Sequence, residues 1–255
     1  MSSLRHAVIL AAGMATRLRP ASNLLPKGLF EIGGASLLGR SVDLLAAQGV
    51  SEILIVTGHH AQQIEAALGT ERGGAVLRYV YNGSYTESGS MVSLLLAAQE
   101  TLEPILLLES DLLYHPDFLA AALAADGDVL LAADVSGSGD EVYLAVDEGK
   151  HLRFLGKHPP EAWRAQAVGE LAGISRLSPE LIERFCARVE AYLERGEGNH
   201  HYEDVLFELA KEGWPIRVEH CPDLPWTEVD TPNDLARAER QVWPRLAAAE
   251  GLLKA

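Results

Sequence analysis

Residues 8–27 have the sequence VILAAGMATRLRPASNLLPK, and this stretch decides the fold. A short apolar run, predicted as a strand over residues 6–11, stops at the small residues 11–13. Small residues let backbone N–H groups approach a triphosphate without side-chain collision. The guanidinium of Arg17 can bind two phosphates in a forked geometry, and Lys27 can place a point charge on a third. The stretch therefore predicts a phosphate-binding loop directly after the first strand.

The loop has neither of two common phosphate-binding patterns, because both G-x-x-x-x-G-K-[ST] and G-x-G-x-x-G are absent. For the loop alone, the alternative is an ordinary strand and turn followed by exposed basic residues. The dipeptide Pro26-Lys27 at this distance favours phosphate binding.

Around this loop, strand-like and helix-like segments alternate through the first half of the chain. Buried strands are expected at residues 6–11, 52–57, 76–81 and 105–109. Helices are expected around Leu38, Val42 and Leu45, over residues 61–68, and over residues 91–99. This order predicts an α/β fold, a Rossmann-like mixed, mostly parallel central sheet flanked by helices. Ligands of such sheets bind outside the carboxyl ends of the strands, where the loop and Asp111 both fall.

The second half changes character but shows no linker. Strands are expected at residues 129–135, 141–146 and 152–156, followed by an amphipathic helix through Leu181, Phe185, Val189 and Leu193. A last helix is expected to begin with Thr231 as N-cap, Pro232 in the first turn and Asp234 near its start. We expect a single domain over residues 1–255, in which about 1–125 bind a nucleotide and about 126–255 bind its acceptor.

The composition sets further limits. Of 255 residues, 48% are hydrophobic, which is enough for the core of one large domain. The net charge of −15 argues against nucleic acid as a partner, because no basic stripe is available to neutralise phosphates. The cysteines, Cys186 and Cys221, suit a reduced cytoplasm. No apolar run reaches the ~18 residues of a membrane span, so we expect a cytoplasmic protein without one.

Carboxylates follow two of the expected strands. Glu109-Ser110-Asp111 ends an apolar run, and a carboxylate there is costly to bury unless it is paired or bound to a metal. On a strand over residues 226–230, Glu228 and Asp230 would point the same way. Hard oxygen ligands suit Mg²⁺, or Mn²⁺ in its place. The alternative makes Asp111 a turn residue and Asp230 part of a helix start.

Residues 10–27, with the I-x-G-like turn at residues 32–34, resemble the signature of the nucleoside-diphosphate-sugar pyrophosphorylase superfamily. Arg19-Pro20 and Pro26-Lys27 fall at positions of that signature. The resemblance implies the nucleotide-diphospho-sugar transferase fold, and transfer of a nucleotidyl group with pyrophosphate leaving. The polar segment at residues 82–94 is similar to the branch of cytidylyltransferases that act on phosphocholine and on small phosphonates.

The resemblance also implies roles for individual residues. The implied catalytic residues are Arg17, Lys27, Asp111 and Lys157. The implied metal ligands are Asp111, Glu228 and Asp230. The implied nucleotide-binding residues are Leu10, Ala11, Ala12, Gly13, Arg17, Lys27, Gly58, Asn82, Ser88, Gly89 and Ser90. The implied acceptor-binding residues are Ser110, Ser136, Ser138, Asp140, Glu141, Lys157 and Gly173. Three of these residues or segments have a structural alternative. Ser90 could be the N-cap of the next helix, residues 136–141 could form a hairpin turn, and Lys157 could be a surface lysine.

The expected reaction is transfer of CMP from CTP to a small phosphonate such as phosphonoformate or 2-aminoethylphosphonate. Asp140 and Glu141 would favour a cationic acceptor if they face the pocket, and a doubly acidic one if they face solvent. Alternatives are a phosphocholine cytidylyltransferase, a sugar or inositol 1-phosphate nucleotidyltransferase, and a non-catalytic nucleotide-binding regulatory protein. A glycosyltransferase would need an Asp-x-Asp motif, which residues 109–111 do not supply.

Other features of the sequence carry less weight. The pairs His59-His60 and His200-His201 are weak candidates for zinc, because adjacent side chains point apart on a strand. Residues 202–204 are expected to form a solvated helix start, with the border of the acceptor pocket as the alternative. The strictness of the CTP preference stays open, as does the oligomeric state, with a homodimer as one option.

Overall fold

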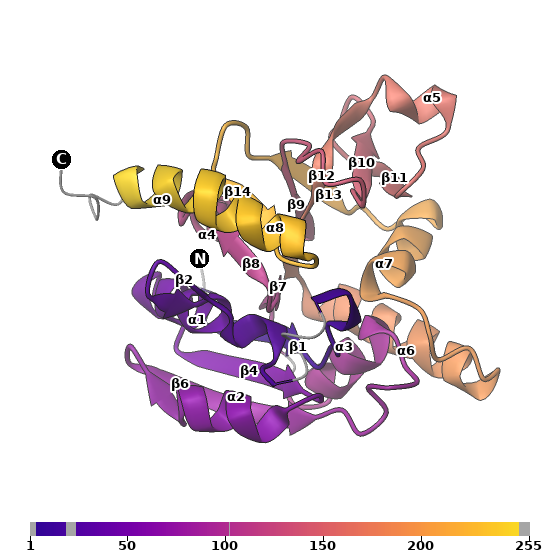
Figure 1. Cartoon of the computed structure of the whole chain (residues 1–255). Coiled ribbons are helices and arrows are strands. Elements are labelled where there is room, and N and C mark those ends of the chain that lie inside the picture. The colour runs from indigo at the N-terminus through magenta and orange to yellow at the C-terminus, as the bar shows by residue number, and fades with distance from the viewer. Residues whose placement is uncertain (1–3, 19–23, 102, 250–255) are drawn as a thin grey trace.

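The computed structural model describes residues 4–18, 24–101 and 103–249. Within these residues the centre of the molecule is a ten-stranded sheet (Figure 1). The strand order is β11-β10-β12-β7-β1-β4-β6-β5, and β9 pairs with both β12 and β13. The strands are β1 (His6–Ala11), β4 (Glu52–Thr57), β5 (Glu71–Arg72), β6 (Ala75–Tyr81), β7 (Ile105–Glu109), β9 (Val129–Ala133), β10 (Tyr143–Val146), β11 (Leu152–Gly156), β12 (Ala167–Leu177) and β13 (Arg217–His220).

The centre of this sheet is parallel. Strand β1 runs parallel to β4 on one side and to β7 on the other, and β4 runs parallel to β6. Beyond β7 the sheet turns antiparallel, because β12 pairs in opposite directions with β7, β9 and β10. The predicted α/β fold with a mixed, centrally parallel sheet is confirmed.

Helices cover both faces of the sheet because successive side chains of a strand point to opposite sides. Val8 and Leu10 of β1 belong to one buried cluster, which contains residues of α3, α6 and α7. Ala7 and Ile9 belong to a second cluster, which contains residues of α1, α2 and α4. These helices are α1 (Leu37–Ala47), α2 (Ala61–Leu68), α3 (Ser90–Ala98), α4 (Asp117–Ala124), α6 (Pro179–Glu194) and α7 (Tyr202–Lys211).

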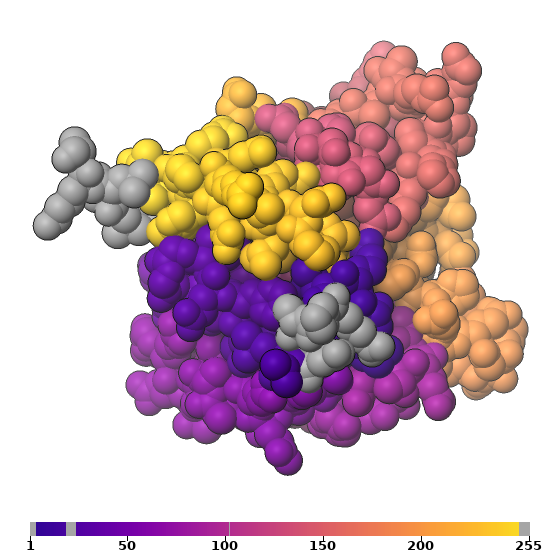
Figure 2. All heavy atoms as spheres, viewed as in Figure 1, coloured from indigo at the N-terminus to yellow at the C-terminus, as the bar shows by residue number. Residues whose placement is uncertain are grey.

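The C-terminal helices pack against the N-terminal segment, as the yellow and indigo surfaces in Figure 2 show. A third buried cluster joins the two, and its members include Leu18, Phe30 and Leu246. Gly33 has a φ of +65°, and a Cβ there would lie 2.1 Å from the Trp243 ring, so only glycine fits. The elements here are η1 (Thr16–Leu18), η3 (Lys27–Leu29), β2 (Glu31–Ile32), β3 (Ala35–Ser36), β8 (Leu112–Tyr114), β14 (Trp226–Glu228), α8 (Pro232–Arg237), η4 (Ala238–Val242) and α9 (Trp243–Ala249).

Several details of the expected elements need correction. The strands expected at 129–135 and 141–146 are shorter, as β9 and β10, and they do not pair with each other. Because β12 lies between them, residues 136–141 cross from one strand to another and do not form a hairpin turn. Leu193 lies outside the apolar face of α6, with 41% of its surface exposed.

The start of the last helix is as predicted. Thr231 accepts a hydrogen bond from the Asp234 N–H, and the Asp234 carboxylate accepts one from the Thr231 N–H. A short helix, α5 (Glu161–Arg164), lies between β11 and β12. No helix of the described residues is long and apolar enough to cross a membrane.

Candidate active site

A cavity of about 410 Å³ lies where β1, β7 and β11 end and where α3 and α7 begin. This is the edge of the sheet at which the sequence places the phosphate loop and the carboxylates. The cavity lining contains most of the predicted site residues, namely Leu10, Ala12, Gly13, Arg17, Lys27, Asn82, Ser88, Gly89, Ser90, Ser110, Asp111, Ser138, Asp140, Glu141, Lys157, Glu228 and Asp230.

The residues Ala11, Gly58, Ser136 and Gly173, also predicted for the site, are not part of this lining. Gly58 supports the phosphate loop from behind, because a Cβ there would lie 2.8 Å from the Ala12 carbonyl oxygen. The Ser136 N–H donates to Glu170 at 2.7 Å, and the Ser136 hydroxyl accepts from the Ser138 N–H at 3.2 Å. Ser136 therefore holds the loop in shape from outside the cavity. Arg19 and Pro20 lie outside the described residues.

Lys27 joins the two halves of the site. Its ammonium group forms ion pairs with Asp111 after β7 and with Asp230 before α8. Burial alone would lower the pKa of Lys27, but the charges of Asp111 and Asp230 outweigh burial and raise it. Burial likewise opposes ionisation of Asp230, yet Lys27 holds the Asp230 pKa low, at about 2. Arg17 also contacts Asp230, at 2.5 Å.

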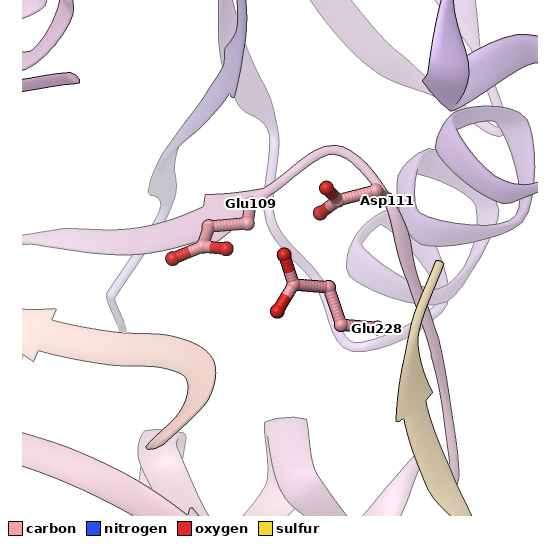
Figure 3. A group of neighbouring side chains, drawn as sticks. All are labelled: Glu109, Asp111 and Glu228. Atoms are coloured by element: carbon pink, nitrogen blue, oxygen red, sulfur yellow. The ribbon is translucent and has the colours of Figure 1, made fainter. Parts of the chain in front are cut away.

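Beside Lys27 lies a cluster of three carboxylates, Glu109, Asp111 and Glu228 (Figure 3). One oxygen of each lies within 4.8 Å of the others. The Oδ1 atom of Asp111 is buried and has no hydrogen-bond partner in the described part of the chain. Burial, and then the neighbouring charge of Asp111, raise the pKa of Glu109 to about 8. Buried carboxylates that crowd together need a cation, and their hard oxygens fit Mg²⁺.

The cluster differs in one member from the predicted ligand set. Asp230 is bound to Lys27 and Arg17, and it hydrogen-bonds to Glu228 at the edge of the cluster. Glu109 is the third member of the carboxylate cluster, and the sequence reasoning assigned it no role. The signal was present in the sequence, because Glu109 ends an apolar strand two residues before Asp111.

On the side of the cavity that was predicted to bind the nucleotide, Asn82 shapes a loop and has no free amide group. It is 1% exposed, and its amide donates to Ser88 at 3.3 Å and to Ser93 at 3.0 Å. Its carbonyl oxygen accepts the Ser84 N–H at 2.9 Å. The side chains of Tyr85 and Ser88 line the cavity beside it.

The start of α3 makes close backbone contacts with the segment before α7. A Cβ on Gly89 would lie 1.9 Å from the His200 carbonyl oxygen, and the Gly89 N–H donates to Gly198 at 3.0 Å. The N-cap of α3 is Gly89, so the alternative of Ser90 as N-cap is wrong. The Ser90 hydroxyl instead accepts the Tyr202 N–H at 3.0 Å.

On the side that was predicted to bind the acceptor, both Asp140 and Glu141 line the cavity. Asp140 forms ion pairs with Arg17 and with Lys157, and these contacts hold its pKa low although burial opposes ionisation. Glu141 accepts the Gly139 N–H at 3.1 Å. The sequence reasoning raised two further lining residues, Tyr202 and Glu203, only as the alternative of a pocket border. It did not assign these others: Tyr85, Ser93, Glu109, Val142, Glu170, Leu171, Asn199, His201, Trp226, Asp234 and Arg237.

The expectation of a solvated helix start at residues 202–204 is wrong for Tyr202. Tyr202 is 1% exposed, and its hydroxyl donates to the Glu109 Oε1 atom at 2.8 Å. Glu203 lines the cavity, and burial raises its pKa. Of the histidines considered for zinc, His200 stacks on Tyr192, and the carboxylate cluster found among the described residues contains none.

Comparisons of the sequence with known proteins find similarity to nucleotidyltransferases. The family model described as "MobA-like NTP transferase domain" matches residues 7–191. A "CMP-5'-(3-aminopropyl)phosphonate synthase" of Streptomyces rubellomurinus is 28% identical over 94% of this chain and 39% of its own length. A "bifunctional IPC transferase and DIPP synthase" of Rubrobacter xylanophilus is 29% identical over 92% of this chain and 51% of its own length. The chain thus spans about half the length, or less, of these curated relatives.

Two solved structures share the fold. The inositol-1-phosphate CTP transferase from T. maritima superposes with a TM-score of 0.79 at 20% identity, covering 99% of both chains. The CTP:phosphocholine cytidylyltransferase from Streptococcus pneumoniae superposes with a TM-score of 0.75 at 20% identity, covering 92% of this chain and 98% of that one. These two superpositions confirm the predicted fold. The family match and the similarity to a CMP-phosphonate synthase confirm the predicted resemblance.

Proposed function

The chain belongs to the family of MobA-like NTP transferase domains, and from this premise we propose that it is a magnesium-dependent cytidylyltransferase. It would transfer CMP from CTP to a small phosphonate and release pyrophosphate. The observation that carries this proposal is that one cavity contains the loop after β1, the carboxylate cluster and the loop between β9 and β10. Nucleotide, metal and acceptor groups would therefore meet in one place.

The proposed reaction is an in-line displacement at the α-phosphorus of CTP. A phosphonate oxygen forms a new bond to this phosphorus, and the bond to the oxygen that bridges to the β-phosphorus breaks. Pyrophosphate leaves with that electron pair. A phosphate monoester loses its second proton near pH ~6, and a phosphonate is somewhat more basic. Much of the acceptor is therefore already dianionic near neutral pH, and no strong base is needed.

The chemical difficulty is that two anions must approach each other. Arg17, Lys27 and Lys157 line the cavity and supply positive charge from three different segments. In the proposal Asp111 and Glu228 hold a magnesium ion, with Asp230 beside them, and the partnerless Asp111 oxygen fits this role. When bound, magnesium supplies further positive charge to the triphosphate and its leaving group.

In this proposal residues 1–125 bind the nucleotide and residues 126–255 bind the acceptor. The division is not strict, because Glu228 and Asp230 reach the carboxylates and Lys27 of the first half. We assign the base to the part of the cavity beside Tyr85 and Ser88. Support for CTP comes from the relatives, since the names of three of those described above contain CMP or CTP.

For the acceptor we propose a phosphonate with a cationic tail. Lys157 suits the phosphonate group, and Asp140 is already neutralised by Arg17 and Lys157. The carboxylates of Glu141, Glu170 and Glu203 also line the cavity, which favours an ammonium group there. Burial raises the pKa of Glu170 and Glu203, and a bound cation would relieve that cost. The aminopropylphosphonate in the name of one relative has such a tail.

A pyrophosphate-release screen tests this proposal. Five nucleoside triphosphates would be paired with 2-aminoethylphosphonate, 3-aminopropylphosphonate, phosphonoformate, phosphocholine and inositol 1-phosphate. The highest kcat/KM is expected for CTP with an aminoalkylphosphonate. A preference above about tenfold for phosphocholine or inositol 1-phosphate, ~1.4 kcal/mol in transition-state binding, would replace the phosphonate assignment. If no combination of nucleotide and acceptor releases pyrophosphate, the proposed transferase activity is wrong.

A further inference from the structure

The carboxylate of Glu109 has no role in the reaction as described so far. It ends β7, and one of its carboxylate oxygens lies within 4.8 Å of an oxygen of Asp111 and of an oxygen of Glu228 (Figure 3). Lys27 forms its ion pairs with Asp111 and Asp230. Lys27 neutralises Asp111 only from one side, since the buried Oδ1 atom of Asp111 has no partner there.

Two features outside β7 hold Glu109 in place. Tyr202 lies in the first turn of α7, and its hydroxyl donates a hydrogen bond to the Glu109 Oε1 atom at 2.8 Å. Gly173, with a φ of +71°, packs close to both neighbours, because a Cβ there would lie 3.1 Å from the Leu112 side chain and 3.3 Å from the Glu109 carboxyl carbon. Gly173 also lies in an irregular part of β12, because the pairing of β12 with β9 shifts register between Leu171 and Ser175. Gly173 lies outside the cavity lining, and its role in acceptor binding stays a prediction.

We propose that Glu109 is a ligand of a divalent cation bound with Asp111 and Glu228, and that Tyr202 positions it. The inference rests on the proposed metal-dependent transfer and extends its metal site by one residue. A second observation besides the acidic cluster supports it, because the Asp111 side chain is only 6% exposed and its unpartnered oxygen is buried beside Lys27.

The hydrogen bond from Tyr202 suits this role chemically. A tyrosine hydroxyl has one proton to donate, so it fixes one Glu109 oxygen and leaves lone pairs of the carboxylate for a cation. Partners that hydrogen-bond to a metal ligand orient it, and their loss typically weakens metal binding about 10–100-fold. Mg²⁺ and Mn²⁺ are the cations that an all-carboxylate site of this kind favours.

The test is a Mn²⁺ titration of the whole chain followed by electron paramagnetic resonance, without nucleotide or acceptor. Glu109→Gln is expected to weaken Mn²⁺ binding about tenfold or more, and Tyr202→Phe severalfold. The chain offers a matched control pair outside the cavity, because the Tyr192 hydroxyl donates to Glu208 at 2.5 Å. Tyr192→Phe and Glu208→Gln are expected to leave Mn²⁺ affinity within about twofold of wild type.

Further variants keep the test decisive if Glu109→Gln fails to fold. Glu109→Asp keeps the charge but draws it back from Tyr202, so an intermediate Mn²⁺ affinity is expected at an unchanged melting temperature. Tyr202→Phe should raise the Mg²⁺ concentration for half-maximal activity and leave the KM for CTP unchanged at saturating metal, which a merely structural role would not do.

Three results would overturn parts of this proposal or reassign Glu109. Wild-type Mn²⁺ affinity in folded Glu109→Gln or Glu109→Asp overturns the ligand role, and a raised acceptor KM in those variants would show that Glu109 contacts the acceptor. Wild-type affinity in Tyr202→Phe overturns the positioning role. The titration uses no substrate, so failure of the pyrophosphate-release screen would leave the Mn²⁺ result standing.

Discussion

Lys27 is the residue on which the charges of the site converge. Its ammonium group is buried between Asp111 and Asp230, which come from opposite ends of the sequence. A lysine whose pKa is raised keeps its positive charge at neutral pH. Lys27 is therefore suited to a fixed positive charge at a phosphate, and unsuited to proton transfer.

Lys27→Ala is expected to lower kcat about 100-fold or more, with the fold retained. Loss of a charge contact made in the transition state costs about 3 kcal/mol, two decades in rate. Steady-state kinetics beside a thermal melt measure both quantities. Lys150→Ala is the control, because Lys150 is exposed and pairs with Glu219 at 3.3 Å, away from the cavity. Near wild-type turnover of Lys27→Ala would exclude a phosphate contact.

Asp111→Asn is expected to abolish turnover while the melting temperature stays close to that of the wild type. The substitution removes a charge that the proposed magnesium ion needs and keeps the shape of the side chain. In the wild type, activity should disappear in EDTA and return on addition of Mg²⁺ or Mn²⁺. Full turnover in the chelator would remove the metal from the mechanism.

At the scale of elements, the sequence predicts those helices and strands whose pattern of apolar residues is local. Strands β1, β4 and β7 were predicted with their observed bounds, because each is a short, nearly continuous apolar run. Strand β12 was not predicted, since Glu170 and Arg176 interrupt its apolar pattern and its three pairing partners are distant in sequence. For the same reason the Glu109 and Tyr202 contact could not be predicted, because 93 positions separate them.

The first turn of α6 depends on a buried carboxylate. Asp128, 6% exposed, accepts the Ser178 N–H at 2.6 Å and the Trp214 indole N–H at 2.8 Å. Hydrogen bonds to a charged group contribute about 1.5–3 kcal/mol, and the donors lose their partner in Asp128→Ala. Urea unfolding should show a loss of about 2–3 kcal/mol. The exposed Asp126→Ala is the control, and equal stability of both variants would contradict this account.

Gly89→Ala is expected to disturb the contact between α3 and the segment before α7. The backbone φ of −80° suits alanine, so any effect comes from the 1.9 Å approach to the His200 carbonyl oxygen. Overpacking of this kind typically costs about 1–3 kcal/mol. The KM for CTP should also rise, because Gly89 lines the cavity. Gly83→Ala is the control, with its nearest neighbour at 3.7 Å, and an identical response of the two variants would refute the contact's importance.

At the scale of the whole molecule, the two ends of the chain complete one site. Strand β8 carries the chain on from Asp111 and pairs with β14, which carries Glu228. The third buried cluster fixes the C-terminal helices against the segment around Lys27. The local sequence indicated each of these residues, but only the folded chain shows that residues about 200 positions apart, such as Lys27 and Asp230, make contact.

The most direct test of the central claim is a ³¹P NMR time course with wild-type protein, CTP, 2-aminoethylphosphonate and Mg²⁺. The three CTP signals are expected to decay while pyrophosphate appears, together with a product whose phosphonate phosphorus couples to the α-phosphorus through a shared oxygen. Unchanged spectra, or release of CMP without any phosphonate adduct, would contradict it.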